Sequence, residues 1–430
     1  MKKNFTLPLS RFVAGPKGPR ALAESLAYCT RCNACVQSCP SYLIHREELF
    51  SPRGRNQLLR LLTEGKIKPD EHLSLIKQTA LDCLLCGRCT AACAGQIPTA
   101  EHMLILHRAA HLRPLPRLLH GLLHLRTKNP VLFARIIALL LFLRKWGGVR
   151  LLRLSGLTAL PALRWIKQAD EMLPRTVGSL RSLLKKNATS STAQHPQLLY
   201  LPSLEAQWLD PDIGLHTMQL CKSKRTEILF ASCAGLFEYL YGQETNLLKA
   251  ARRFLRQWEK YSQPKPRPLL TDSIDVYVLL KNYPVLFAAW PSWKKRAEKL
   301  AENTRFVTDF PFPKPNQLQA QTSALDSTCL VSPAPEKCVS SARKILKTHF
   351  GKNLVECDYS PFPAPHAGAH FARTETTRKV EKKCAQCAAR QQIQVIYTLS
   401  GFAALGWNAA LKRRYPAARA KHIICLYTGL

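Results

Sequence analysis

The chain has 430 residues, of which 46% are hydrophobic, so it is long and apolar enough for two or three domains with real cores. Its 63 basic and 28 acidic residues give a net charge of +35. No nucleic-acid-binding motif accompanies this charge, so we expect an acidic protein or an anionic lipid surface as the partner, and no nucleic acid.

Residues 1–20 are predicted to be a flexible lead, and residues 21–112 are predicted to form a domain with two matching cysteine runs. Both runs read C-x2-C-x2-C-x3-C, the spacing that holds [4Fe–4S] clusters. We therefore predict two [4Fe–4S] clusters as cofactors. The first run is Cys29, Cys32, Cys35 and Cys39, and the second is Cys83, Cys86, Cys89 and Cys93.

In two-cluster ferredoxins the last cysteine of each run binds the other cluster. The predicted ligands of the first cluster are Cys29, Cys32, Cys35 and Cys93, and those of the second cluster are Cys83, Cys86, Cys89 and Cys39. Zinc is the alternative, because paired CxxC motifs also bind zinc. The third and fourth cysteines of each run fit a cubane better. Disulfides are the least expected, because sixteen cysteines without a signal peptide indicate a reduced, intracellular chain.

The two runs are 54 residues apart in the sequence, and apolar residues recur at helical spacing between them. This pattern predicts an α-helical ferredoxin-type domain. Four arginines are close to the cysteines in sequence, and a reduced cluster gains a negative charge that nearby cations favour. We predict that these arginines tune the reduction potential; they are Arg31, Arg53, Arg55 and Arg88.

Residues 113–186 are predicted to be basic helices rich in leucine and arginine, and residues 187–197 a linker. The most apolar segment, Val131–Leu143, contains Arg135 and is shorter than the roughly 20 residues that a spanning helix needs. Two explanations remain open. The segment lies in a membrane interface, or it packs on another subunit or on the chain's own core.

Residues 198–430 alternate strand-like and helical runs, which predicts an α/β region with a parallel or mostly parallel sheet. Two similar halves are expected, at about 198–320 and 321–430. The predicted strands are 227–233, 267–271, 329–332, 353–357, 395–400 and 422–427, and the predicted helices include 274–282, 336–348, 373–391 and 401–414.

The strings CTRCNACVQSCPSYLIHREELFSPRGR and CLLCGRCTAACAGQIPTAEHMLILHR resemble the iron–sulfur subunits of the glycolate oxidase family. More broadly they are similar to the iron–sulfur subunits of lactate, glycerol-3-phosphate and heterodisulfide-type oxidoreductases. The resemblance implies an electron-transfer subunit that receives electrons from a flavoprotein dehydrogenase subunit acting on glycolate or another 2-hydroxy acid. It also implies that the electrons leave to a quinone or another carrier.

The same resemblance implies cysteine-rich loops in the second half of the chain, and these cysteines are largely missing here. No cysteine occurs in 271–275, 360–371 or 398–402. We therefore predict no third cluster. Cys384 and Cys387 form a CxxC without a second pair to complete a zinc site, so we expect thiols of no special role.

Nothing in the sequence indicates chemistry on an organic substrate, because it has no dinucleotide-binding fingerprint and no P-loop. An assembly or docking subunit with structural clusters is the alternative function. A self-sufficient reductase is disfavoured by the missing cysteines. The expected location is the cytoplasm, and peripheral attachment to the inner face of the cell membrane remains open.

Overall fold

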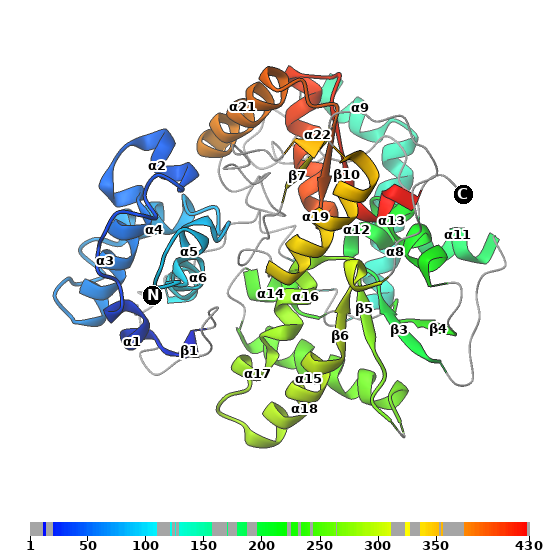
Figure 1. The fold of residues 1–430 in the computed structure, drawn as a ribbon, viewed down its shortest axis with the longest axis horizontal. Helices are drawn as coiled ribbons and strands as arrows, with labels where there is room; N and C mark the ends of the chain where they lie inside the picture. The colour runs from blue at the N-terminus through cyan, green and yellow to red at the C-terminus, as the bar shows by residue number, and fades with distance from the viewer. Residues whose placement is uncertain are drawn as a thin grey trace.

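The structure is a computed structural model. It describes residues 12–13, 20–109, 121–122, 125, 129–156, 170, 179–186, 196–221, 225–230, 234–240, 244–263, 265–310, 323–326, 336–351, 354–355 and 374–427. In Figure 1 the N-terminal helices, in blue, lie beside an α/β body that contains two sheets. The lead at 1–20 and the linker at 187–197 lie almost wholly outside the described residues.

The N-terminal part is helical, as predicted from the apolar spacing between the cysteine runs. Its longer helix α3 begins where the Ser51 hydroxyl accepts a hydrogen bond from the Gly54 amide at 2.8 Å, and Pro52 fits the first turn. Leu59 of α3 and Met103 of α6 are both fully buried in one core. The elements are β1 (Phe12–Val13), β2 (Arg20–Ala21), α1 (Leu22–Ala27), α2 (Pro40–His45), η1 (Glu48–Phe50), α3 (Pro52–Thr63), α4 (Leu73–Leu81), α5 (Arg88–Ala91) and α6 (Thr99–Ala109).

The basic segment that follows contributes helices α8 (Pro130–Lys145), α9 (Gly148–Leu154) and α11 (Leu180–Lys186). The predicted apolar segment lies inside α8. Helix α8 starts where the Asn129 side chain accepts a hydrogen bond from the Leu132 amide at 3.0 Å. Among the described residues, no helix combines the length and the apolar character needed to cross a bilayer.

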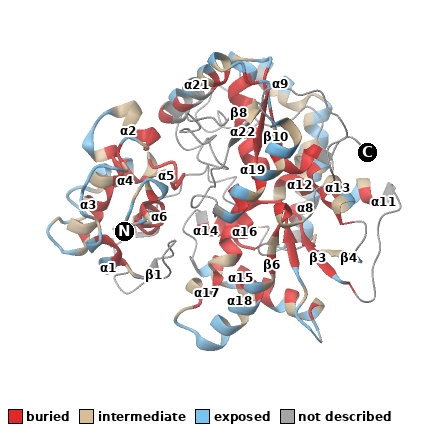
Figure 2. Cartoon of the chain, in the orientation of Figure 1, coloured by how far each residue is buried: buried red, intermediate tan, exposed pale blue. Residues whose placement is uncertain are grey.

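The first sheet has four parallel strands in the order β4-β3-β5-β6. Its strands are β3 (Leu198–Leu201), β4 (Thr226–Ile228), β5 (Leu269–Thr271) and β6 (Thr304–Phe306). The strands are short and apolar, and β3 and β5 are buried throughout, as Figure 2 shows in red for β3. The accompanying helices are α12 (Leu204–Trp208), α13 (Pro211–Leu220), α14 (Leu236–Leu240), α15 (Glu244–Tyr261), α16 (Ile274–Lys281), α17 (Tyr283–Leu286), α18 (Pro291–Asn303) and η3 (Val307–Asp309).

The second sheet is also parallel, in the order β10-β9-β7-β8. When the four strands of each sheet are numbered in chain order, both sheets have the order 2-1-3-4. The predicted parallel sheet is therefore confirmed. The elements are β7 (Ser323–Asp326), α19 (Glu336–Phe350), β8 (Leu354–Val355), α21 (Thr374–Arg390), β9 (Val395–Thr398), α22 (Gly401–Arg414), β10 (Arg419–His422) and η5 (Ile423–Tyr427).

The expected strand at 422–427 is wrong: only His422 is in a strand, and Ile423–Tyr427 is a 3-10 helix. Strand β10 pairs with β9 up to the couple His422 and Thr398, where β9 ends, so the later residues have no ladder to join. A short apolar run does not distinguish a strand from a buried helical turn. The expected strand at 329–332 lies outside the described residues, and β7 precedes it.

The carboxyl ends of strands from the two sheets meet in a buried polar junction. The Ser400 hydroxyl, after β9, donates to Asp275 at 2.7 Å, and the Ile274 amide, after β5, donates to the Leu399 carbonyl at 3.1 Å. The Phe402 amide donates to Glu205 at 3.3 Å. The two sheets also share one apolar core, so they are packed together as one body.

Glu205 is fully buried at this junction, and burial raises its pKa to about 8, with the nearby charges of Asp272 and Asp275 adding to the rise. Asp272 accepts hydrogen bonds from the Tyr200 hydroxyl at 2.7 Å and the Ser203 amide at 2.8 Å. Its pKa is raised to about 6 by burial. At neutral pH burial at this junction therefore favours the protonated form of Glu205, whereas Asp272 stays mostly ionised.

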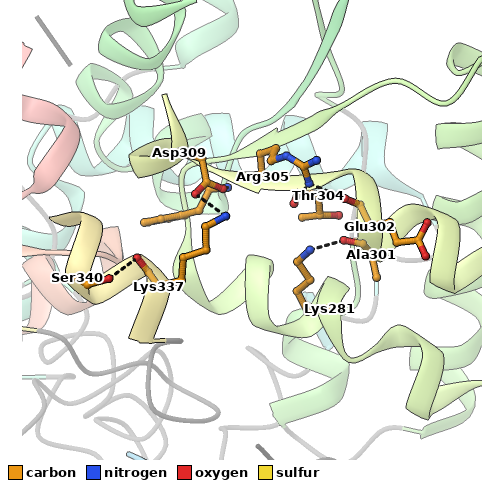
Figure 3. A network of polar contacts seen from close by, with 9 residues as sticks. Lys281, Ala301, Glu302, Thr304, Arg305, Asp309, Lys337 and Ser340 are labelled. Carbon is orange, nitrogen blue, oxygen red and sulfur yellow. Dashed lines mark hydrogen bonds and ion pairs between the residues drawn. The ribbon is translucent and has the colours of Figure 1, made fainter. Parts of the chain in front are cut away.

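The elements that accompany the two sheets also contact each other at the surface, between α19 and η3. Lys337 of α19 forms an ion pair of 3.5 Å with Asp309 of η3, as Figure 3 shows. In the same view the Lys281 ammonium donates to the Ala301 carbonyl, and Ser340 donates to the Lys337 carbonyl at 3.1 Å. This network ties the helix of the second sheet to the end of the first.

Candidate metal centre

The two cysteine runs have the same backbone conformation at equivalent positions. Arg31 and Asn33, on either side of Cys32, have φ of 59° and 69°. Leu85 and Gly87, on either side of Cys86, have φ of 54° and 67°. Three of these four residues carry a side chain, and a left-handed conformation is uncommon for such residues. Each run is therefore curled into a tight loop in the same way.

The loops differ in how far they are buried. Cys39, Cys83 and Cys86 are buried, whereas Cys32 is exposed, and the other four cysteines are half-buried. None of the eight is in a disulfide. The second run is enclosed because Leu84 and Cys86 pack in an apolar core with residues of α21 and α22 from the far end of the chain.

The Cys35 thiol of the first run interacts with a cysteine of the second run. Burial first, and then the charges of Cys29, Cys93 and Cys32, together raise the pKa of Cys35 to about 11. Cys93 is thus brought to the first loop although it belongs to the second run.

The reciprocal arrangement occurs at the second loop. Burial raises the pKa of Cys89 well above its usual value, and the charges of Cys86, Cys39 and Cys83 add to the effect. Cys39 of the first run is therefore grouped with the second. Cys35 also acts on Cys89, so the two groups of four thiols are close to each other.

Each group consists of four thiols, a donor set that suits a [4Fe–4S] cubane. Within the part of the chain that the structure describes, no three His, Cys, Asp or Glu side chains surround a point as ligands of a single ion would. A cubane takes one thiolate on each of four irons, so its ligands are spread more widely than those of one ion. The thiol groups thus fit the cluster for which their spacing is typical.

Arg55 is the buried cation of this site. It is 2% exposed, and it donates to the Cys39 sulfur at 3.5 Å, the Ser41 hydroxyl at 2.9 Å and the Thr79 carbonyl at 3.3 Å. Burial alone would lower its pKa, but the charges of Cys83 and Cys39 outweigh burial and raise it. The guanidinium is held against the second group of thiols.

The other three arginines are less enclosed. Arg53 binds both oxygens of Glu48 at 2.7 Å, donates to Asn33, and lies near enough to Cys35 to interact with its charge. Arg88 donates to the Ser38 carbonyl at 3.3 Å and acts on Cys86. Arg31 is exposed. Of the four, Arg55 has the closest described contact with a thiol.

A buried polar network behind the loops escaped the sequence reasoning. His102 of α6 is fully buried, with its two ring nitrogens 2.9 Å from Asn56 of α3 and from Ser25 of α1. Asn56 also donates to Thr99 at 2.9 Å. Burial lowers the pKa of His102 to about 3, so the ring is neutral and links three helices. Its only sequence signal is a histidine within an apolar helical run.

Helix α21 contacts the cysteine domain beside the second run, and Figure 1 shows it approaching α2. The Thr376 hydroxyl donates to Asp82 at 2.9 Å and lies 2.9 Å from the His45 ring. Lys383 donates to the Leu43 carbonyl at 3.3 Å. Asp82 directly precedes Cys83, so α21 covers the start of the second loop.

The remaining cysteines are separate from these groups or outside the described residues. Cys221, Cys338 and Cys425 are buried, and Cys387 is half-buried on α21. Burial raises the pKa of Cys338 and of Cys425 to about 12, which keeps both as thiols. Cys233, Cys329 and Cys357 lie outside the described residues, as do 360–371.

The segment that holds the two cysteine runs is also the segment that matches known proteins. Residues 25–97 match the 4Fe-4S dicluster domain. The matched segment contains all eight cysteines of the two runs. Iron–sulfur chemistry of the 4Fe-4S type is therefore assigned to this part of the chain.

Two curated relatives match over the same segment. The chain is 38% identical over 73 residues to the probable glycolate oxidase iron-sulfur subunit of Bacillus subtilis, which covers 17% of this chain and 16% of that protein. It is 33% identical over 75 residues to the glycolate oxidase iron-sulfur subunit of Escherichia coli, 17% of each chain. The chain thus matches about a sixth of the length of these relatives. No solved structure matches it.

Proposed function

We propose that this chain is the electron-transfer subunit of a flavin-dependent 2-hydroxy-acid dehydrogenase, with glycolate as the first candidate substrate of the partner subunit. The observation that carries the proposal is the pair of identically curled cysteine loops whose thiols interact across the two runs. Two bound [4Fe–4S] clusters would supply one-electron carriers. A quinone or another carrier is the proposed acceptor.

The proposed ligands follow the two groups of thiols. Cys29, Cys32, Cys35 and Cys93 hold one cluster, and Cys83, Cys86, Cys89 and Cys39 hold the other. The interaction of Cys35 with Cys89 supports a short path between the two clusters. Arg55 is proposed to favour reduction of the second cluster, and Arg53, Arg88 and Arg31 to have smaller effects.

The α/β region is proposed to be two similar halves, divided between β6 and β7. The equal strand order of the two parallel sheets supports this division. The second half contributes α21 and α22 to the enclosure of the second loop. We propose that the α/β region positions the cysteine domain in a complex whose other members are the flavoprotein and the inner face of the cell membrane.

The test is reduction of the purified, cluster-loaded full chain by its flavoprotein partner. Electron paramagnetic resonance would follow the cluster signals under anaerobic conditions after glycolate is added. We expect both clusters to be reduced within the turnover time of the partner. Clusters that remain oxidised while the flavoprotein turns over would show that they are structural, which is the assembly-subunit alternative.

The partner's substrate is tested separately. Lactate and other 2-hydroxy acids replace glycolate in the same assay. Reduction by one of these acids but not by glycolate would keep the electron-transfer function and change only the substrate class.

A further inference from the structure

Exposed apolar side chains are concentrated on one short helical hairpin, α8 with α9. Of the twelve exposed large hydrophobic side chains among the described residues, nine lie between residues 131 and 154. Trp146 and Leu154 are 75% and 76% exposed. The nine are Val131, Leu132, Leu139, Leu140, Phe142, Leu143, Trp146, Leu151 and Leu154. Isolated exposed apolar residues are normal, but a concentrated set marks an interaction surface.

The exposed residues of α8 share a face. Val131, Leu139, Phe142 and Trp146 follow helical spacing, so their side chains form a stripe along the helix. The rings of Phe142 and Trp146 are 5.6 Å apart. Phe133, on the other side of the helix, is buried. The helix therefore anchors one side in the protein and presents the other side to the surroundings.

The charge of the hairpin is wholly positive. Residues 130–154 contain five arginines and lysines and no acidic residue. Arg135 lies within the apolar stripe and is exposed, and Lys145 and Arg150 are exposed near the turn between the helices. Arg144 is instead bound to Asp170 at 2.7 Å and half-buried, which fixes the protein side of the hairpin. Long basic side chains can place their charge at a lipid headgroup while their stems remain apolar.

We infer that the α8–α9 hairpin docks in the plane of an anionic lipid bilayer, with its apolar stripe in the acyl boundary and its basic residues at the headgroups. Sixteen residues of α8 are too few to span, but an interfacial helix needs only one apolar face with basic residues beside it. Trp146 is placed at the end of the stripe, and tryptophan is enriched at membrane–water interfaces. This inference rests on the proposed membrane location and names the surface responsible for it.

The test is flotation of the full chain with vesicles of phosphatidylglycerol and phosphatidylcholine. We expect binding to the anionic vesicles that weakens at high salt, because salt screens the attraction to the headgroups. Leu139→Ser with Phe142→Ser should lower the partition by about a hundredfold, because burial of each apolar side chain contributes about tenfold. Leu75→Ser, at an exposed apolar position on α4, is the matched control and should leave binding unchanged.

A second readout locates the hairpin at the bilayer. Lipids brominated on the acyl chain should quench tryptophan fluorescence of the wild type, and Trp146→Phe should remove that quenching although six other tryptophans remain. Binding that both serine substitutions leave intact would assign membrane attachment to another surface. No binding at low salt would overturn the inference and the membrane location together.

Two other occupants of the face would also overturn the inference. A dimer in solution that Leu139→Ser with Phe142→Ser dissociates would mean that the face binds a second copy. Flotation that requires an added membrane protein would mean a protein partner. Reduction of the clusters in solution is independent of all these outcomes, so failure of membrane docking is distinguishable from failure of electron transfer.

Discussion

Arg55 donates a hydrogen bond to the Cys39 sulfur at 3.5 Å from a position that is almost fully buried. The two residues come from different elements, α3 and the residue before α2, and the guanidinium also interacts with Cys83 and Cys89. A permanent positive charge is therefore built into the second group of thiols.

The first prediction is that Arg55→Gln lowers the reduction potential of the cluster bound by Cys39. Arg55 contacts a proposed ligand of that cluster, and a cation about 5 Å away at an effective dielectric of about 20 is worth roughly 3.3 kcal/mol, or about 140 mV for one electron. Redox titration followed by electron paramagnetic resonance measures the shift. Arg55→Lys keeps the charge and should retain most of the potential. Arg53→Gln, which removes a cation already bound to Glu48, should shift it less.

The second prediction concerns the ligands that cross between the runs. Cys93→Ser should remove or destabilise the cluster of the first loop and leave that of the second. Iron should fall from about eight to about four atoms per chain, since each cubane has four. Cys387→Ala, at a half-buried position on α21, should leave the iron content unchanged. Loss of the second-loop signal in Cys93→Ser would contradict the crossing, and about twelve irons in the wild type would reveal a third cluster.

The third prediction uses the buried carboxyl of Glu205, whose pKa is raised to about 8. Between its usual pKa near 4.5 and about 8 the folded state holds a proton that the unfolded state releases, so this residue makes stability fall as pH rises. Glu205→Gln should remove this contribution to the pH dependence. Relative to the wild type, the variant should gain more free energy of unfolding at pH 8 than at pH 5. The expected gain is a few kcal/mol at most, since each pKa unit corresponds to about 1.4 kcal/mol.

Thermal unfolding at several pH values measures this effect. Glu298→Gln, on the exposed side of α18, is the control and should change stability by no more than a few tenths of a kcal/mol. Equal pH profiles for the wild type and Glu205→Gln would show that Glu205 is ionised in the folded protein.

The fourth prediction concerns the contact of α21 with the second loop. Thr376→Val removes the donor to Asp82 and leaves that carboxylate and the His45 ring without this partner. We expect about 1–2 kcal/mol of lost stability and faster loss of iron to a chelator, because the start of the second loop is less well held. Bleaching of the cluster absorbance measures the rate. Thr348→Val on α19, where the hydroxyl donates to the Lys344 carbonyl of its own helix, is the control.

The two matching loops of the site could be predicted from the sequence, because the spacing of the cysteines repeats. The repeat of cysteines predicted both loops, and the left-handed residues at equivalent positions agree with it. The grouping of Cys93 with Cys35 follows a rule for two-cluster proteins, and the charge interactions support it. The closeness of Arg55 to the thiols could be predicted from the sequence alone, because only α2 and η1 separate Cys39 from the helix that contains Arg55.

The parts that escaped prediction depend on contacts between distant segments. Strand β3 is only four residues long, and β6 three, so neither has a periodicity to recognise. The His102 network joins three helices, and the covering of Cys86 by α21 joins residues from opposite ends of the chain. Such contacts follow from how the elements pack and have no local pattern.

Cys86 and Ala388 share one apolar core, which has a consequence for how the protein is made. The ribosome adds about 5–20 residues per second, so the roughly 300 residues between these positions take about 15–60 s to synthesise. Throughout that interval the second loop lacks its cover. During this interval the second loop of the nascent chain is therefore accessible to iron and sulfide, and equally to oxidants. The order of synthesis therefore makes the folding of α21 and α22 the step that covers the second loop.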